Sequence, residues 1–275
     1  MHSTRHLINL ALREDIGPGD ITTDNLIPKE REGRGIIIAK EPLILAGLDV
    51  AKQVFTILDS NIEFSSDYED GDRIEDKTLI LEIKGSLRTL LKGERTALNF
   101  LQRLSGIATH VRSYVDILGD LPVRLVDTRK TTPGWRTLEK YAVRTGGAHN
   151  HRMGLYDGVL IKDNHIAACG GIAEAVRRLR GMVSHLVRIE IETSDLDQVK
   201  EALDSGVDVI MLDNMNHNQI REAVKLISGR AIVEVSGMLT KKDLKALAGI
   251  GVDIISSGAL THSAPSVDLS MRISP

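Results

Sequence analysis

ALDSGVDVI, at residues 202–210, and ALAGIGVDII, at residues 246–255, run in the same order. Each starts with a helical pattern, passes through glycine to Val-Asp, and continues into a β-branched run that is typical of a strand. Glycine is common just after a helix because it adopts the left-handed conformation at little cost. Two such joins predict a chain that alternates helices with strands.

The rest of the chain after residue 121 repeats this alternation. Strands are predicted at 123–126, 158–161, 186–191, 207–212, 231–235 and 252–256, with helices at 173–182, 196–206 and 219–228 among them. Alternating strands and helices imply a parallel sheet. Six such units in about 140 residues favour a partly open (β/α) barrel of the TIM type. An open doubly wound sheet is the alternative, since periodicity alone does not exclude it.

Before residue 121 the pattern is different. An amphipathic helix is predicted over 1–20, ending at Gly17-Pro18-Gly19, and a second helix over 93–118. The stretches 33–47 and 76–91 have the apolar patterns of strands. This part of the chain is therefore predicted to form an α+β layer.

Composition limits the possible functions. The 275 residues carry a net charge of −3, so no overall positive field favours nucleic acid as a partner. Cys169 is the only cysteine, which rules out an intrachain disulfide and fits a cytoplasmic location. No apolar run is long enough to span a bilayer, and the first residues lack the apolar core of a signal peptide. Any anion site must be local.

Chemically active side chains follow the predicted strands. They are Arg129 and Lys130, Lys162 with Asp163, Glu192, Asp213, Ser236, and Ser257 with Gly258. In a barrel these positions converge on one face, where catalytic groups lie. A single charge after a strand is more often a solvated loop residue or a helix cap, but six strand ends of this kind indicate a site.

The kind of side chain at these strand ends changes along the chain. Cations come from the first two strands and the loop between them, which also contains His149, His151 and Arg152, and carboxylates come from the next two. Small residues whose main-chain N–H groups can approach an anion follow the last two strands. Arginine forks suit carboxylates and phosphates. The pattern predicts a substrate with several negative charges, a divalent metal or sugar hydroxyls held by acids, and a phosphate held by main chain.

The stretch DTRKTTPGWRTLEKYAVRTGGAHNHRMGLYDGVLIKDNHI, residues 127–166, resembles the quinolinate phosphoribosyltransferase family. The likeness continues through EDIGPGDITTDNLIP, ERTALNFLQRLSGIAT, EVSG and SSGALTHSAPSVDLS, and so covers nearly the whole chain. The resemblance implies an N-terminal α+β sandwich domain, taken as 1–110, and an α/β barrel domain, taken as 111–264. Residues 265–275 are expected to return to the first domain.

The resemblance also implies a reaction. Quinolinate and phosphoribosyl pyrophosphate give nicotinate mononucleotide, carbon dioxide and pyrophosphate, with Mg²⁺, in a homodimer. By matching motifs, the implied catalytic residues are Lys130, Lys162, Glu192 and Asp213, the two acids also holding the metal. The implied substrate-binding residues are Arg95 from the partner chain, Thr128, Arg129, His151, Arg152, Ser236, Gly237, Met238, Ser257, Gly258, Ala259 and His262.

The chain departs from the family pattern at Met238, where a second glycine is usual. If that glycine serves for close main-chain approach or a positive φ, Met238 would cost about 1–2 kcal/mol or shift the phosphate. If its N–H is simply a donor at an ordinary φ, little changes. Two other reactions stay possible. One is a phosphoribosyltransferase of the same fold that uses nicotinate, although the many cations favour a diacid. The other is a Schiff-base aldolase with Lys162 as nucleophile. A binding protein without catalysis would be expected to lack some of these charges.

Overall fold

The computed structural model describes residues 2–237 and 240–275, and these form two compact units. The first unit contains the chain up to Arg112 together with Thr131–Gly147 and Leu260–Pro275, and the second contains Ser113–Lys130 and Ala148–Ala259. The boundaries 1–110 and 111–264 stay a prediction about domains. In the structure, Thr131–Gly147 groups with the first unit although it interrupts the second in sequence.

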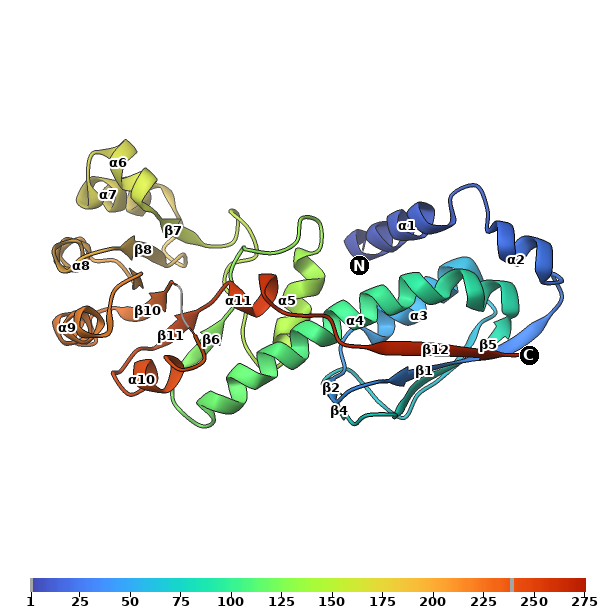
Figure 1. Ribbon diagram of the computed structural model, residues 1–275. Coiled ribbons are helices and arrows are strands. Elements are labelled where there is room, and N and C mark those ends of the chain that lie inside the picture. The colour runs from blue at the N-terminus through green and yellow to red at the C-terminus, as the bar shows by residue number, and fades with distance from the viewer. Residues whose placement is uncertain (1, 238–239) are drawn as a thin grey trace. The chain divides into compact units, whose positions relative to one another are not determined.

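The first unit is built on a four-stranded antiparallel sheet with the strand order β12-β1-β5-β3 (Figure 1). The strands are β1 (Glu32–Ala39), β3 (Glu63–Ser65), β5 (Leu79–Ser86) and β12 (Leu269–Ser274). Gly35 in β1 lies opposite Ile83 in β5 and Ile273 in β12. The last strand of the chain therefore completes the sheet formed by its first strands.

Helices and a short second sheet accompany this sheet in the chain. The helices are α1 (His2–Ile16), α2 (Ile21–Leu26), α3 (Leu48–Leu58), α4 (Leu87–Leu118), which continues into the second unit, and α5 (Arg136–Thr145). β2 (Leu43–Ile44) pairs with β4 (Arg73–Ile74). Ile37, Ile83 and Leu101 are fully buried, which places the core on the apolar faces of these elements.

Several element boundaries in this unit differ from the predictions. The predicted strand 33–47 is two strands, since β1 ends at Ala39 and β2 begins after Pro42, which cannot donate a ladder hydrogen bond. The predicted strand 76–91 ends at Ser86, and α4 begins at the next residue. A leucine-rich run is compatible with a strand or a helix, so the spacing of its apolar residues did not show where β5 ends and α4 begins. The helix over 1–20 ends at Ile16, and the separate helix α2, capped by Asp20, was not predicted.

The second unit contains six parallel strands in the order β6-β11-β10-β9-β8-β7. They are β6 (Arg124–Val126), β7 (Val159–Ile161), β8 (Ile189–Thr193), β9 (Val209–Asp213), β10 (Ile232–Ser236) and β11 (Ile254–Ser256). Among the described residues, β6 and β7 are the outermost strands of this sheet and do not pair with each other, so the sheet is open. The predicted α/β class with a partly open, barrel-like parallel sheet is confirmed.

Helices connect these strands, and local sequence explains their ends. They are α6 (Asp163–Cys169), α7 (Ile172–Met182), α8 (Leu196–Asp204), α9 (His217–Ile227), α10 (Leu244–Ala248) and α11 (Ala259–His262), whose last three residues belong to the first unit. Asp195 caps α8 by accepting from the N–H of Gln198. After α8 and α10, Gly206 and Gly251 have φ values of 70° and 96°. The predicted helix–glycine–strand joins are therefore confirmed.

None of the helices in the described part of the chain combines the length and the apolar character needed to cross a membrane.

Candidate active site

The carboxyl ends of the six parallel strands carry most of the predicted site residues. Asp213 and Ser236 are partners in the register of β9 and β10. Glu192 is the next-to-last residue of β8, Lys162 directly follows β7, and Ser257 directly follows β11. Because parallel strands end at one edge of their sheet, where ligands of open α/β sheets bind, the second unit brings these five residues to the same edge.

Lys162 and Glu192 form an ion pair between Nζ and Oε2 at this edge. The Glu192 side chain is 19% exposed and that of Lys162 is 42% exposed. The main-chain N–H of Lys162 donates to His165 Nδ1 at 3.0 Å, which fixes the start of α6 beside the pair. A Schiff base requires a neutral, unencumbered amine. An ammonium held by a carboxylate does not favour the aldolase alternative.

Asp213 lies beside a tight main-chain contact between β9 and β10. Asn214 donates from Nδ2 to Asp213 Oδ2 at 2.7 Å, and its own N–H donates to the Ser236 carbonyl at 3.1 Å. Gly237 has a φ of 135°, and a Cβ there would lie 2.7 Å from Asn214 Oδ1. Gly237 is therefore required for both its conformation and its lack of a side chain. The predicted effect of Met238 concerns a residue outside the described part of the chain.

Arg152 lies in a partly buried position within the second unit. Its guanidinium donates to the carbonyl of Gly158 at 3.0 Å. Burial lowers the pKa of Arg152 below its ordinary value, and the positive charge of Arg129 lowers it further. Two guanidinium groups that repel each other in a partly desolvated place are the arrangement expected of an anion site.

The loop after β6 holds Arg129 and Lys130 in exposed positions. The Thr128 hydroxyl accepts a hydrogen bond from the N–H of Lys130 at 3.1 Å, which shapes the turn. Asp127, which directly follows β6, is fully buried. Its carboxylate accepts from Asn150 Nδ2 at 2.5 Å and from the N–H of His151 at 2.9 Å. This acid therefore ties the strand end to the loop that carries Arg152.

His151 is held by partners on both ring nitrogens. Nδ1 accepts from the N–H of Arg152 at 2.7 Å. Nε2 lies 3.1 Å from Glu190 Oε2 and 3.6 Å from Glu234 Oε1. The predicted contact of His151 with substrate stays a prediction, since the imidazole already links the Arg152 main chain to two acids.

Glu190 and Glu234 were not predicted as site residues. Both are buried, and their ligating oxygens lie with a nitrogen of His151 within 4.8 Å of one another. Burial raises the pKa of Glu234 to about 7, and the negative charge of Glu190 raises it as well. The signal was present in the sequence as a glutamate two positions before Glu192 and another two before Ser236, because alternate residues of a strand share a face.

A main-chain turn follows β11. The N–H of Ser257 donates to the Val126 carbonyl at 3.1 Å, and the Ser257 side chain accepts from the N–H of Ala259 at 3.3 Å. Ser257 is 3% exposed, whereas Gly258 and Ala259 are partly exposed. Gly258 and Ala259 are small, so their main chain stays accessible at the same edge of the sheet, where β9 ends at Asp213 and β10 ends at Ser236.

Two predicted site residues belong to the first unit. Arg95 is exposed on α4, and His262 is exposed at the end of α11. His262 Nδ1 and the Ser263 hydroxyl lie 2.9 Å apart. The structure thus divides the predicted residues, with Arg95 and His262 in the first unit and the remaining described ones in the second.

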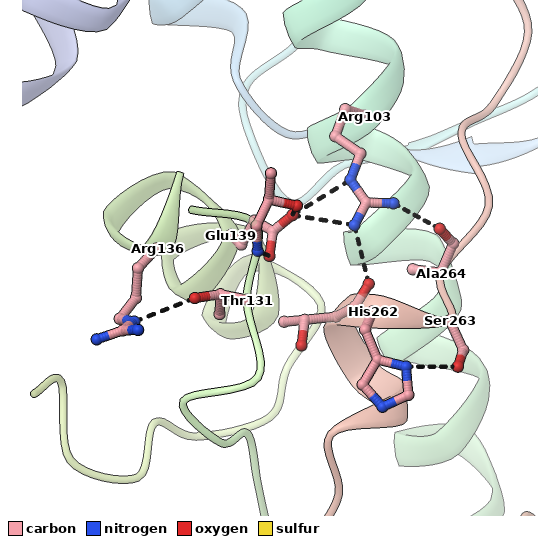
Figure 2. Close-up of polar contacts among 9 residues, drawn as sticks. Arg103, Thr131, Arg136, Glu139, His262, Ser263 and Ala264 are labelled. Carbon is pink, nitrogen blue, oxygen red and sulfur yellow. Dashed lines mark hydrogen bonds and ion pairs between the residues drawn. The ribbon is translucent and has the colours of Figure 1, made fainter. Parts of the chain in front are cut away.

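A buried ion pair within the first unit connects three of its segments (Figure 2). Arg103 on α4 donates to Glu139 Oε1 on α5 at 3.0 and 3.3 Å, and to the carbonyls of Thr261 and Ala264 at 2.9 and 2.6 Å. Glu139, which is fully buried, also accepts from the main chain and hydroxyl of Thr132 at 3.1 and 2.8 Å. This pair was not predicted.

Glu192 and Asp213 have the donor chemistry that suits Mg²⁺, which prefers carboxylate oxygens and retained waters. In each carboxylate one oxygen has a protein partner, Oε2 with Lys162 and Oδ2 with Asn214. The second oxygen of each can face an ion, so the residues present fit the metal that the resemblance implies.

Two family models match nearly the whole chain. The model described as the quinolinate phosphoribosyl transferase N-terminal domain matches residues 20–105, and the model of the C-terminal domain matches residues 107–272. A probable nicotinate-nucleotide pyrophosphorylase [carboxylating] of Bacillus subtilis is 46% identical over 269 residues, covering 98% of this chain and 93% of that protein.

Solved structures agree with these matches. NadC from Streptococcus pyogenes is 44% identical with a TM-score of 0.94, covering 98% of this chain and 95% of the other. The nicotinate-nucleotide pyrophosphorylase from Francisella tularensis is 40% identical with a TM-score of 0.94, covering 99% and 96%. The chain belongs to the quinolinate phosphoribosyl transferase family.

Proposed function

We propose that the protein transfers the phosphoribosyl group of phosphoribosyl pyrophosphate to the ring nitrogen of quinolinate, releasing pyrophosphate and carbon dioxide and forming nicotinate mononucleotide for NAD biosynthesis. Membership of the family supports this reaction. The observation that carries it is the pairing of cations with acids at one sheet edge, where Arg129 and Arg152 lie in the same unit as the Lys162–Glu192 pair.

Quinolinate has two adjacent carboxylates, and the proposed pocket supplies several cations for them. The positive charge of Arg129 disfavours the charged form of Arg152, so a bound anion would offset that repulsion. Lys130 and Lys162 add further charge. When the ring nitrogen is ribosylated it becomes positive, and this charge stabilises the carbanion that is left on the adjacent ring carbon when its carboxylate departs as carbon dioxide. That carbon then takes up a proton from water. These steps do not require a side-chain nucleophile.

Glu192 and Asp213 are proposed to act on the other substrate. Loss of pyrophosphate leaves positive charge on the ribosyl centre, which flanking carboxylates stabilise more in the transition state than in the ground state. Mg²⁺, held by these two acids, would neutralise charge on the pyrophosphate that leaves. The main chain of Ser236–Gly237 and Ser257–Ala259 is proposed to hold the 5′-phosphate.

The assembly is proposed to be a homodimer in which Arg95 serves the partner's site. Exposure of Arg95 on α4 is compatible with a contact between chains. A two-fold dimer would exchange this contact reciprocally.

The single cysteine fits the reducing compartment expected for a cytoplasmic enzyme.

The test is product formation by the purified chain with quinolinate, phosphoribosyl pyrophosphate and Mg²⁺. We expect nicotinate mononucleotide and pyrophosphate in equal amounts, and little product when Mg²⁺ is removed by chelation. Glu192→Gln and Asp213→Asn should lower kcat more than they weaken quinolinate binding. Failure to form product under these conditions would overturn the proposal, and unchanged kcat in both variants would remove the role assigned to the acids.

A further inference from the structure

Asp127 connects the two segments that carry the arginines of the proposed quinolinate pocket. It directly follows β6 and is fully buried, and Arg129 comes two residues later in the chain. Its carboxylate accepts from Asn150 Nδ2 at 2.5 Å and from the N–H of His151 at 2.9 Å, and Arg152 is the next residue. One buried acid thus links the segment of Arg129 to the segment of Arg152.

Main-chain hydrogen bonds accompany this link. The N–H of Asp127 donates to the His149 carbonyl at 3.1 Å, and the N–H of His149 donates to the Leu125 carbonyl at 2.9 Å. Val126 and His149 form a parallel bridge. The main chain around His149 therefore runs beside the end of β6, and the Asp127 side chain holds the two residues that follow His149.

A carboxylate suits this position better than a neutral side chain. Both oxygens of Asp127 accept hydrogen bonds, one from a side-chain amide and one from a main-chain N–H. Hydrogen bonds to an ionised acceptor are roughly twice as strong as those between neutral groups. Residues 128–130 and 150–152 lie in irregular segments, whose position depends more on supporting contacts of this kind than that of a strand does.

The charges on the two segments increase the need for such support. The positive charge of Arg129 lowers the pKa of Arg152, so the two side chains repel each other. The Arg152 guanidinium is aligned by its bond to the Gly158 carbonyl at 3.0 Å. Like charges on separate irregular segments stay close when the main chain of those segments is held. Asp127 provides this hold from the end of β6.

We propose that Asp127 is a positioning residue for the quinolinate pocket, which keeps the segments of Arg129 and Arg152 together through its bonds to Asn150 and His151. This inference rests on the proposed function, because it assigns the effect to quinolinate affinity. Asp127 acts through the two arginines and is assigned no contact with the reacting atoms. Loss of its bonds should therefore raise the KM for quinolinate more than it lowers kcat.

The test reverses the contact between Asp127 and Asn150. Asn150→Asp alone places a second carboxylate against the first, so the KM for quinolinate should rise about tenfold or more. Asp127→Asn alone leaves two amides, one of which can turn to present its oxygen, so the rise should be about fivefold. The double variant Asp127→Asn/Asn150→Asp again pairs one carboxylate with one amide, and its KM should return to within about twofold of wild type.

Two comparisons separate positioning from a general loss of structure. In each variant the KM for phosphoribosyl pyrophosphate and kcat should change much less than the KM for quinolinate. A merely structural role predicts that all three constants worsen together as the free energy of unfolding falls. The matched control is Asp59→Asn/Asn61→Asp, the same exchange in an exposed turn of the first unit, where the N–H of Asn61 donates to Asp59 Oδ1 at 2.9 Å. It should leave all three constants unchanged.

A folded Asn150→Asp variant with a normal KM for quinolinate would overturn the inference. A double variant no better than Asn150→Asp would overturn it too, because the contact would then not be the cause of the loss. Equal rises in the KM values of the two substrates would do the same. If Asn150→Asp does not fold, Asp127→Asn decides, since an unchanged KM for quinolinate in that variant contradicts the proposed role.

Hydrogen exchange at the main-chain N–H of His151 measures the contact without turnover. Exchange should be slow in the wild type, faster in Asn150→Asp and slow again in the double variant. Fast exchange in the wild type would contradict the contact itself. Wild-type protein that shows this pattern but does not use quinolinate would overturn the proposed function and the assignment to quinolinate. Normal turnover with an unchanged KM in the variants would overturn the inference alone.

Discussion

Arg152 lies in surroundings unlike those of an ordinary surface arginine, because burial and Arg129 both disfavour its charged form. Arg152→Ala should raise the KM for quinolinate by about tenfold or more, since a carboxylate loses its fork partner. Arg152→Lys should recover part of the loss, because an ammonium cannot donate two parallel bonds. Arg221→Ala on exposed α9 serves as the control. Normal quinolinate binding by the Arg152→Ala variant in calorimetry would show that Arg152 has another role.

Glu234 gives a prediction for stability against pH. Burial raises its pKa to about 7 from an ordinary value of 4.5, so the folded state keeps a proton that the unfolded state loses. The stabilisation from this group is complete below pH 4.5 and is lost as the pH rises through about 7. Relative to wild type, Glu234→Gln should therefore gain on the order of 2 kcal/mol of unfolding free energy between these limits. Urea denaturation across this range measures it, and a constant difference would contradict it.

Some residues of the candidate site could be predicted from the sequence, and others could not. Asp213, Glu192 and Lys162 were found because each follows or ends a β-branched run. Glu190 and Glu234 were missed because a glutamate inside a strand has the same letter whether it faces solvent or the core. The bond from Asn214 to the Ser236 carbonyl depends on which strands are neighbours, and the sequence does not state the strand order.

Among the elements, the strands and the helix–glycine joins of the second unit were predictable because each has a local signal. The boundary between β5 and α4 was not, because no turn residue separates them. The Arg103–Glu139 pair joins α4 to α5, and Arg103 also bonds Thr261, 158 residues away in sequence. Local periodicity contains no information about such a contact.

That pair predicts an asymmetry in stability. Arg103 and Glu139 side chains are 22% and 0% exposed, whereas those of Arg34 and Glu82, another ion pair of the first unit, are 49% and 19% exposed. Glu139→Gln should lower the free energy of unfolding by about 3 kcal/mol, because Arg103 keeps a poorly solvated charge. Glu82→Gln should lower it much less, because its ion pair with Arg34 is more exposed to solvent. Chemical denaturation of both variants measures their free energies of unfolding. Equal losses would show that the Arg103–Glu139 pair contributes no more to stability than the Arg34–Glu82 pair.

For the whole molecule, the proposed dimer predicts complementation between two inactive variants. Arg95→Ala and Lys162→Ala homodimers should both be nearly inactive, the first lacking the arginine supplied to the partner and the second lacking a residue of its own strand-end site. Refolding them together should give heterodimers with one doubly defective site and one intact site. Activity should return to roughly a quarter of wild type if subunits assort at random.

Each variant refolded alone is the control for this mixing experiment. If Arg95 serves the site of its own chain, every site in the heterodimer carries one defect and mixing restores nothing. Sedimentation of the wild-type chain provides the accompanying check, since a stable monomer with full activity would exclude a shared site.

The ratio of kcat/KM for quinolinate to that for nicotinate tests most directly whether the strand-end cations form a pocket for a diacid. Nicotinate lacks one carboxylate, so it would make fewer charge-assisted hydrogen bonds to the Arg129, Lys130, Arg152 and Lys162 side chains. We therefore expect quinolinate to be preferred on the order of a hundredfold or more. Equal or better use of nicotinate would contradict the assignment of these residues to a dicarboxylate.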